Sequence, residues 1–367
     1  MKVGLAMIGR GLEGGGGAER RFFRVWKHLR AQREDHVLLV NRALLESAIN
    51  AGVLAAADRH GQIVVLPEYG GGSVSSALLR ALRRQKIDVL HLPLAHRRLV
   101  PFYMRLALEG GIGIAHTVAL SALAYATRVP LSTLWVSRGL WRLAHAIDAL
   151  YPAFRENVAV PRGFASKVRV TPCSFSDPQQ FAPASDKSAT IVFAGRLIPE
   201  KQPLLFVDAL QRLRSSGGSP WRAVIAGRGP LRQDVQGAVA RLGLTSEVEV
   251  IEEVNLATVL AHSRVFVSLQ MTENYPSQSL LEAMLCENAV VATDVGDTRR
   301  LVRDGETGVL VHPDPGRVAD AISSLIETPR RAAALGRSAR AFVQREHTIG
   351  RFIGHLREVW ELARATV

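Results

Sequence analysis

The chain has 367 residues, which at roughly 100 to 200 residues per domain predicts two or three domains with sizeable cores. Apolar residues make up 47% and charged residues 22%, so the composition excludes both a largely disordered chain and a small disulfide-stabilised one. The formal net charge is +13, and the whole excess falls within residues 1–170, which hold 24 Lys and Arg against 11 Asp and Glu. This asymmetry indicates that one domain faces an anionic molecule or surface, the alternative being an ordinary basic soluble protein.

The start of the chain, residues 1–17, is one short apolar run followed by glycines, without the longer apolar segment of a secretory signal. The longest apolar stretch, residues 111–126, is shorter than the ~20 residues that a membrane-spanning helix needs. Cys173 and Cys286 are the only cysteines, and we expect free thiols in a reducing compartment. We therefore predict a cytoplasmic protein without a transmembrane segment.

The first half alternates short apolar runs with longer segments of helical spacing. The runs expected to form strands are residues 2–8, 36–40, 62–66, 87–92 and 111–115. They are continuous in Val, Ile and Leu, which is typical of strands buried on both faces of a parallel sheet. Residues 1–170 are therefore predicted to form an amino-terminal α/β domain of Rossmann type.

A change of composition marks the end of this domain, because residues 171–188 are rich in Pro, Ser, Asp and Gln and read as a linker. The alternation then resumes, with apolar runs at residues 190–195, 222–227, 248–253, 264–270, 289–294 and 308–313. Residues 189–345 are predicted to form a second Rossmann-like domain, and residues 346–367 a closing helix able to pack back on the first. Ligands of such sheets bind beyond the carboxyl ends of the strands, so we expect a cleft between the two domains.

Four consecutive glycines, Gly14 to Gly17, follow the first predicted strand and precede a helix. Glycines at this place let backbone N–H groups approach an anion at the helix N-terminus, although a flexible turn is the alternative. The spacing does not match G-x-G-x-x-G, so no dinucleotide cofactor is predicted.

Arg196 and Lys201 follow the first predicted strand of the second domain. A guanidinium and an ammonium on a strand-to-helix loop can clamp a diphosphate, and a solvated basic loop is the alternative. Gly227 and Gly229 follow the next strand, where their turn brings the backbone close to the same place. No D-x-D sequence occurs in the chain, so no metal site is predicted and the two cations would take its place.

Residues 268–282 run from a strand through a polar loop into a helix that carries Glu282. The four residues from Ser279 to Glu282 also fit a capping box, in which the glutamate bonds the backbone N–H of the residue before the helix. Glu282 therefore has a structural alternative to a binding role.

Taken together, these segments resemble the retaining glycosyltransferases of family 4, which have the GT-B fold of two Rossmann-like domains with parallel sheets facing across a cleft. The resemblance covers nearly the whole chain and is carried, in this order, by GGAER, HTV, TPCSFSDPQQFAP, GRLIPEK, AGRGPL, SLLEAM, VVATDVGD and DGETGVLV. It implies transfer of a sugar from a nucleotide diphosphate sugar to a hydroxyl by front-face substitution, without a cofactor or a side-chain nucleophile. Bacterial cell-envelope polysaccharide, lipopolysaccharide or glycolipid synthesis is the implied setting.

The resemblance also implies roles for individual residues. Arg196 and Lys201 match the pair that holds the donor diphosphate, His116 matches the histidine over the transferred sugar, and Glu282 matches the carboxylate that binds the nucleotide ribose. Read from its residues alone, His116 has a buried structural role as its alternative, and His91 is interpreted as structural. The remaining donor-binding residues implied are Gly15, Gly16, Gly17, Gly195, Gly229, Val254, Ser277, Gln278 and Ser279.

The chain departs from the family pattern at two places. The family has a second glutamate separated by seven residues from the one at Glu282, but Asn274 occupies that position and Glu273 precedes it. Either Glu273 reaches the donor sugar through a one-residue bulge, or Asn274 does so. Val250 and Glu252 stand where the family commonly has Phe and Gly, which leaves the base pocket open.

The basic first domain would hold the acceptor, so we predict a phosphorylated, lipid-linked or otherwise anionic acceptor. The segment from Arg20 to Arg30 combines five basic residues with three aromatic ones, so its helix either inserts aromatics into an anionic membrane at its inner face or buries them in the core. The segment ALRRQK at residues 81–86 adds basic charge on another helix.

Three other functions compete with transfer. A sugar-nucleotide epimerase of the same two-domain build would bind the same donor, and a non-catalytic homologue would only bind it. A nucleic-acid-binding protein would explain the charge, but the sequence contains no RNP-like, zinc-finger or helix-turn-helix signature. No nucleic-acid partner is therefore predicted.

Overall fold

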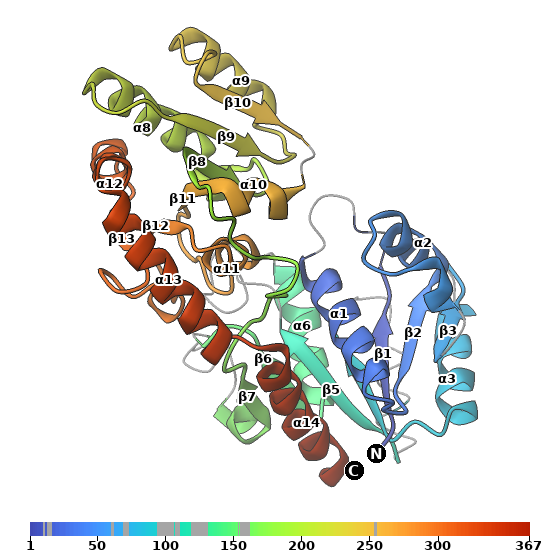
Figure 1. Ribbon diagram of the computed structural model, residues 1–367. Coiled ribbons are helices and arrows are strands. Elements are labelled where there is room, and N and C mark those ends of the chain that lie inside the picture. Colours follow the sequence, from blue (N-terminus) through green and yellow to red (C-terminus); the bar gives the residue numbers. More distant parts are fainter. Residues whose placement is uncertain are drawn as a thin grey trace. The chain divides into compact units, whose positions relative to one another are not determined.

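The computed structural model describes residues 1–9, 12, 17–59, 62–68, 73–93, 106, 111–118, 131–152, 154, 162–252 and 255–367. They form two compact units (Figure 1). The first unit comprises Met1–Pro172 together with Phe352–Val367, and the second comprises Cys173–Arg351.

The first unit is built on a seven-stranded parallel sheet with the strand order β3-β2-β1-β4-β5-β6-β7. Its strands are β1 (Val3–Met7), β2 (Val37–Asn41), β3 (Ile63–Leu66), β4 (Val89–Leu92), β5 (Gly113–Val118), β6 (Ala146–Ala149) and β7 (Val168–Val170). All five predicted runs form strands, β1 to β5. The sequence analysis missed β6 and β7, because both are very short and β6 contains the charged residue Asp148.

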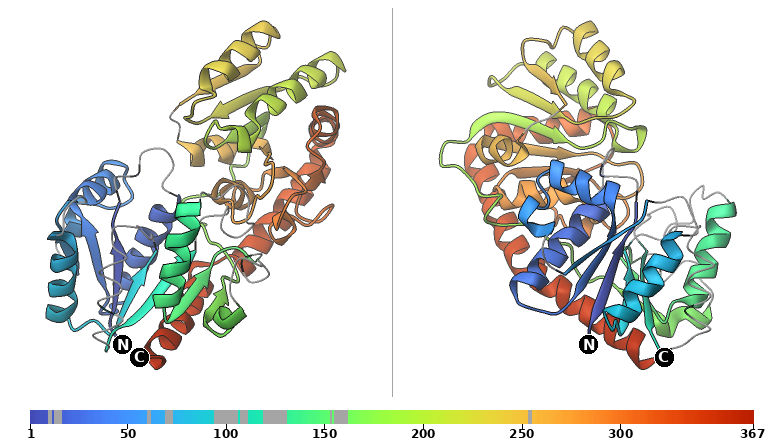
Figure 2. Two further views of the ribbon diagram at one scale, coloured as in Figure 1. Left: turned by 180° about the vertical axis from the view of Figure 1, so that it is seen from behind. Right: turned by 90° about the vertical axis from the view of Figure 1, so that its right-hand side faces the viewer.

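Helices cover both faces of this sheet (Figures 1 and 2). The described helices of the unit are α1 (Gly17–Ala31), α2 (Arg42–Asn50), α3 (Ser73–Arg84), α6 (Leu131–Leu143) and α14 (Ile349–Ala365). On one face, the Phe22 ring of α1 contacts the rings of His91 on β4 and Phe352 on α14. On the other face, apolar side chains of α3 and α6 join one core cluster with side chains of the strands.

The second unit has a six-stranded parallel sheet with the strand order β10-β9-β8-β11-β12-β13. Its strands are β8 (Ser188–Ala194), β9 (Arg222–Ala226), β10 (Val248–Ile251), β11 (Ser263–Ser268), β12 (Ala289–Thr293) and β13 (Val309–Val311). Its helices are α8 (Pro203–Ser215), α9 (Arg232–Arg241), α10 (Leu256–His262), α11 (Gln278–Leu285), α12 (Pro315–Glu327) and α13 (Pro329–Glu346). Every predicted run forms a strand, so the prediction of two Rossmann-like parallel-sheet domains is confirmed.

The segment predicted as a linker, residues 171–188, is largely without regular structure, and from Cys173 onward it belongs to the second unit. Phe175 and Phe181 are buried in that unit, and the Ser174 backbone N–H donates to His347 Nδ1 at 3.3 Å. The segment is therefore packed along the second unit rather than free.

The chain end forms α14, of which Ile349–Arg351 belong to the second unit and Phe352 onward to the first. The helix lies so close to β5 that a Cβ atom on Gly113 would stand 2.6 Å from the Ala363 carbonyl oxygen. Glycine at position 113 thus permits the contact between the last helix and the sheet.

Cys173 and Cys286 are buried free thiols, as predicted. No helix in the described ranges is long and apolar enough to cross a bilayer.

Candidate functional site

Two glycine-containing loops meet at the carboxyl ends of β8 and β9. The Leu197 N–H donates to the Arg228 carbonyl at 2.8 Å, and the Leu231 N–H donates to the Leu197 carbonyl at 3.0 Å. A Cβ atom on Gly229 would lie 2.3 Å from the Leu197 carbonyl oxygen, so any side chain there would push the loops apart. Glycine at position 229 therefore permits the close approach of these two loops, which the two hydrogen bonds maintain.

Lys201 lies over the first of these loops. A Cβ atom on Gly195 would meet the Lys201 Cδ at 3.4 Å, which places the lysine stem along the glycine backbone. The side chain of Lys201 is half-buried, whereas that of Arg196 is exposed. Burial, and then the positive charge of Arg196, lower the pKa of Lys201 to about 8.

Neither cation is neutralised by a carboxylate of the described residues. In the part of the chain that the structure describes, neither the Lys201 ammonium nor the Arg196 guanidinium forms an ion pair with a carboxylate. Two like charges within electrostatic reach of each other, one of them half-buried, favour a bound anion. The structure thus brings together the two residues predicted to hold a diphosphate.

The two candidates for the donor-sugar contact, Glu273 and Asn274, have different surroundings. Asn274 is 3% exposed, its Oδ1 accepts from Ser268 Oγ at 3.1 Å, and its Nδ2 donates to the Ser268 carbonyl at 3.3 Å. Asn274 therefore anchors the loop to the end of β11.

Glu273 instead faces the loop that follows β12. Its carboxylate accepts from the Tyr275 N–H at 2.5 Å and from the Asp297 N–H at 3.1 Å. Burial raises the pKa of Glu273 to about 7, although these N–H groups act in the opposite direction. Sequence reasoning did not identify Ser268 and Asp297 as the partners that separate the two candidates, although Asp297 lies in the VVATDVGD segment.

The loop of Lys201 and the loop of Glu273 lie next to each other. The Met271 N–H donates to the Glu200 carbonyl at 3.0 Å, and the Gln270 N–H donates to Thr293 Oγ1 at 2.8 Å. Residues that follow β8 and β11 and the last residue of β12 are thereby joined at the carboxyl edge of the sheet, where ligands of such sheets bind.

Glu282 does not cap its helix. Helix α11 begins at Gln278, Ser277 precedes it without a side-chain cap, and Ser279 lies inside the first turn. The capping-box alternative for Ser279 and Glu282 is therefore wrong by two residues. Instead, Glu282 is 7% exposed and its Oε1 accepts from Gln278 Nε2 at 3.2 Å.

Glu252, one of the two departures from the family pattern that leave the base pocket open, belongs to a charge pair. Arg228 Nε lies 3.2 Å from Glu252 Oε1, and both side chains are exposed. Val250, the other departure from the family pattern, is half-buried on β10. Gly15, Gly16 and Val254 lie outside the described residues.

In the first unit, His116 is 5% exposed on β5. Its Nδ1 lies 3.1 Å from the Leu92 carbonyl oxygen, which can only accept, so Nδ1 carries the hydrogen. Burial lowers the pKa of His116 and keeps the ring neutral at pH 7, which leaves Nε2 as an acceptor. This geometry is compatible with a substrate contact and with a structural role alike.

The burial of helix α1 decides whether its aromatic side chains insert into a membrane or pack in the core. Phe22, Phe23 and Trp26 are at most 1% exposed, so the idea that they insert into a membrane is wrong. They face the core because the sheet needs an apolar cover on this side. Arg21 is also buried, with its guanidinium 6.0 Å from the centre of the Phe352 ring, whereas Gly17, the first residue of the helix, is exposed.

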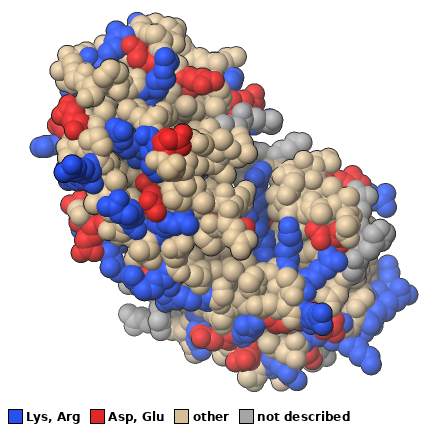
Figure 3. All heavy atoms as spheres, viewed as in Figure 1, with Lys and Arg blue, Asp and Glu red and all other residues tan. Residues whose placement is uncertain are grey.

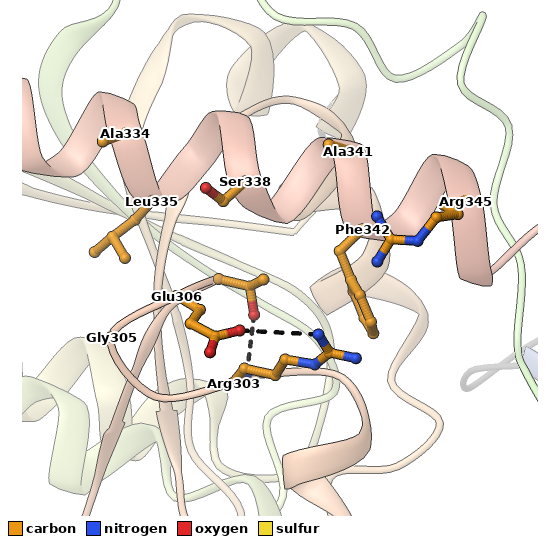
Figure 4. A pocket seen from close by; sticks show the side chains of 10 residues that line it. Arg303, Gly305, Glu306, Ala334, Leu335, Ser338, Ala341, Phe342 and Arg345 are labelled. Carbon is orange, nitrogen blue, oxygen red and sulfur yellow. Dashed lines mark hydrogen bonds and ion pairs between the residues drawn. The ribbon is translucent and has the colours of Figure 1, made fainter.

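A pocket of about 440 Å³ lies between α13 and the loop that precedes β13 (Figure 4). The Arg303 guanidinium stands 4.7 Å from the centre of the Phe342 ring at one end of it, and its Nη1 lies 3.8 Å from Glu306. None of the predicted donor-binding residues lines this pocket. The candidate site is therefore the loop cluster at the carboxyl edge of the sheet.

Comparison with known proteins relates part of the chain to one family. Residues 176–342 match the family described as glycosyl transferases group 1. The chain is 29% identical over 150 residues to GalNAc-alpha-(1->4)-GalNAc-alpha-(1->3)-diNAcBac-PP-undecaprenol alpha-1,4-N-acetyl-D-galactosaminyltransferase of Campylobacter jejuni, which covers 40% of this chain and 41% of that protein. It is 30% identical over 218 residues to D-inositol 3-phosphate glycosyltransferase of Rhodococcus erythropolis, which covers 56% and 49%. The chain thus spans less than half the length of each of these relatives.

Solved structures share the fold over the whole length. Anabaena Alr3699/HepE in complex with UDP superposes with a TM-score of 0.79 at 17% identity, covering 98% of this chain and 100% of that one. Sucrose-phosphate synthase from Thermosynechococcus elongatus superposes with a TM-score of 0.78 at 17% identity, covering 100% of both chains. Residues 176–342 are thus similar to the glycosyl transferases group 1 family, and the two parallel-sheet units share the fold of these solved structures.

Proposed function

We propose that this protein is a retaining glycosyltransferase that moves a sugar from a nucleotide diphosphate sugar to a hydroxyl of an anionic acceptor. The observation that carries the proposal is the pair Arg196 and Lys201, which has no carboxylate partner among the described residues. Their loop is hydrogen-bonded to the loop of Glu273 at the carboxyl edge of the second sheet. Such a pair suits a diphosphate, which carries negative charge before the reaction and gains more as it leaves.

In this reaction the bond between the sugar's anomeric carbon and the diphosphate oxygen breaks, while the acceptor oxygen bonds to that carbon on the same face. The proton of the acceptor hydroxyl passes to the departing phosphate oxygen. Arg196 and Lys201 stabilise the charge that develops on the diphosphate, and Glu273 and Glu282 accept hydrogen bonds from the donor's hydroxyl groups. Fixed charges of this kind need no rearrangement at the moment of reaction.

Named relatives support the two substrates. Anabaena HepE was solved with UDP and with UDP-glucose, which favours a uridine nucleotide in this fold. The Campylobacter jejuni relative is named for a PP-undecaprenol-linked acceptor and the Rhodococcus erythropolis relative for inositol 3-phosphate. Both names describe anionic acceptors, and the first describes a lipid-linked one.

The charge of the first unit favours the same class of acceptor. This unit holds 26 Lys and Arg against 13 Asp and Glu, whereas the second holds 20 of each. Four of these cations, Arg80, Arg83, Arg84 and Lys86, are exposed on and just after α3, with no acidic residue between Ser73 and Lys86. Figure 3 shows basic side chains gathered at the edge of the molecule where α3 lies.

We assign this basic surface of α3 to contact with an anionic membrane at its cytoplasmic face, as part of cell-envelope glycolipid or polysaccharide synthesis. A few exposed basic residues give reversible attachment to anionic lipid without any inserted side chain. A lipid-linked acceptor would then lie beside the unit that receives it.

The test is incubation of the purified protein with a panel of nucleotide sugars, with and without lipid-linked diphosphate acceptors. We expect slow release of nucleoside diphosphate from one donor, made faster by the acceptor, with the anomeric configuration retained in the product. Isomerisation of the free donor sugar would identify an epimerase instead. Binding of a donor without any turnover would identify a non-catalytic homologue.

A further inference from the structure

Gln278 and Glu282 form a pair on the first two turns of α11. They are four residues apart and therefore lie on the same side of the helix. Gln278 Nε2 lies 3.2 Å from Glu282 Oε1 and 3.2 Å from the carbonyl oxygen of Phe175. The amide thus joins the helix to the segment that begins the second unit.

The chemistry of the two partners determines how the amide is oriented. A backbone carbonyl and an ionised carboxylate can only accept, so the NH₂ end of Gln278 must face both and give one hydrogen to each. Reversing the amide would set its oxygen against two acceptors. Both hydrogens of the Gln278 NH₂ group are therefore engaged, and the amide cannot rotate without losing both bonds.

The pair also explains how Glu282 is tolerated in its surroundings. Its side chain is 7% exposed among the buried residues Leu281, Ala283 and Leu285 of the same helix. A carboxylate in such a place needs hydrogen-bond donors, and Gln278 is one of them. The bond also restricts the torsions of the glutamate side chain, which sets the direction of the carboxylate.

We propose that Gln278 is a positioning residue for donor recognition, which holds the Glu282 carboxylate toward the two hydroxyls of the nucleotide ribose without touching the nucleotide. This inference rests on the proposed function. The role proposed for Gln278 differs from direct contact with the donor, because Gln278 acts through the Glu282 carboxylate alone and affects only recognition of the ribose.

The test compares ligands that differ only in the ribose. Binding of UDP and of 2′,3′-dideoxy-UDP, and of the two guanosine counterparts, is measured by calorimetry with the full chain and its variants. Gln278→Met keeps the length of the side chain and removes the donor, and Gln278→Ala serves as a second variant. Gln236→Ala, at an exposed position of α9, is the control, and thermal unfolding reports whether each variant folds.

We expect the unchanged protein to prefer the ribonucleotide at least tenfold, and Gln278→Met to reduce this preference to about threefold or less with unchanged affinity for the dideoxy ligand. In the presence of Glu282→Gln, the Gln278 substitution should have no additional effect. An undiminished preference in both folded Gln278 variants, or an equal loss of affinity for both ligands, would overturn the inference alone. Failure of the unchanged protein to bind any of the four nucleotides would overturn the proposed function as well.

Discussion

His355 Nε2 lies 2.8 Å from Asp148 Oδ1, although 207 residues separate them in the chain. The same carboxylate accepts from Thr171 Oγ1 at 2.6 Å and from Thr117 Oγ1 at 2.8 Å. Asp148 is fully buried on β6, and His355 comes from the last helix, α14. The hydrogen bonds of the buried Asp148 carboxylate thus join the last helix, α14, to the first sheet.

The bond extends into a chain of polar contacts. His91 Nδ1 accepts from Trp360 Nε1 at 3.0 Å, so His91 Nε2 carries the hydrogen and donates to Thr117 Oγ1 at 2.8 Å. Burial lowers the pKa of His91 to about 3, which keeps its ring neutral. His91 is therefore structural, and its role is to connect α14 to β4 and β5.

We predict that Asp148→Asn destabilises the first unit by about 3 kcal/mol, the scale of breaking one member of a buried pair. Burial alone would raise the pKa of Asp148, but the hydrogen bonds from His355 and Thr171 outweigh it and hold the pKa below its ordinary value. This stabilisation is present above pH 3.8 and is lost as the pH falls through the lower folded-state pKa. Chemical denaturation measures the loss, with Asp186→Asn at an exposed position as the control. Equal stability of the two variants would contradict the prediction.

Activity is predicted to survive chelation. In the proposed function, Arg196 and Lys201 neutralise the diphosphate in place of a metal ion, and the chain has no D-x-D sequence. Donor turnover with excess EDTA should therefore equal that with added magnesium or manganese. Loss of turnover that either metal restores would refute this.

The charge of Lys201 should also determine how donor binding depends on pH. Because the pKa of Lys201 is about 8, its ammonium loses its proton as the pH rises through that value, and donor affinity should fall there. Lys201→Arg keeps its charge throughout and should remove the decline. Replacement of either cation by Ala should lower turnover by about 100- to 1,000-fold, as loss of one preorganised donor does. Affinity measured between pH 6.5 and about 9.5 decides the first point, and a decline that persists in Lys201→Arg would assign it to another group.

Substitutions of Glu273 and of Asn274 are predicted to affect different properties, turnover in the first case and stability in the second. Glu273→Gln should lower turnover by more than tenfold with little loss of folding, because the loop remains anchored by Asn274. Asn274→Ala should destabilise the protein by about 1–3 kcal/mol, because it leaves the buried Ser268 groups without their partner. Turnover and denaturation measured side by side would show the reverse pattern if Asn274 meets the sugar.

The pH dependence of stability distinguishes the same two variants. The folded-state pKa of Glu273 is raised from 4.5 to about 7, so its contribution to stability is complete below 4.5 and is lost as the pH rises through 7. Glu273→Gln should remove this decline, whereas Asn274→Ala should keep it. Identical pH profiles for the two variants would exclude burial of the Glu273 charge.

Replacement of Arg80, Arg83, Arg84 and Lys86 by Gln should reduce binding to anionic vesicles at least tenfold, because each cation near such a surface contributes independently. The control replaces four exposed arginines of α13, namely Arg330, Arg331, Arg337 and Arg345. Sedimentation with anionic and neutral vesicles at several salt concentrations measures the effect, since screening weakens such contacts. Equal binding of the two quadruple variants would assign the positive charge of the first unit to a soluble acceptor.

The sequence by itself determined the architecture and the loops that carry the site. Continuous runs of Val, Ile and Leu between helical segments have few stable arrangements other than parallel strands covered on both faces. Eleven of the thirteen strands in the described residues could therefore be predicted. Arg196, Lys201 and Glu273 could be placed at strand ends for the same reason. Each of these inferences depends on residues near one another in the chain.

Only the tertiary structure decided the contacts that come from far along the chain. A four-residue strand with Asp148 at its centre is stable because Thr117, Thr171 and His355 arrive from three other elements, and no local pattern announces them. The surroundings of Glu273 and Asn274 likewise depend on hydrogen-bond partners outside their own local pattern, and those of Glu282 on where α11 begins. Local spacing predicts an element, but the direction of a side chain within a loop depends on which distant donors and acceptors satisfy it after burial.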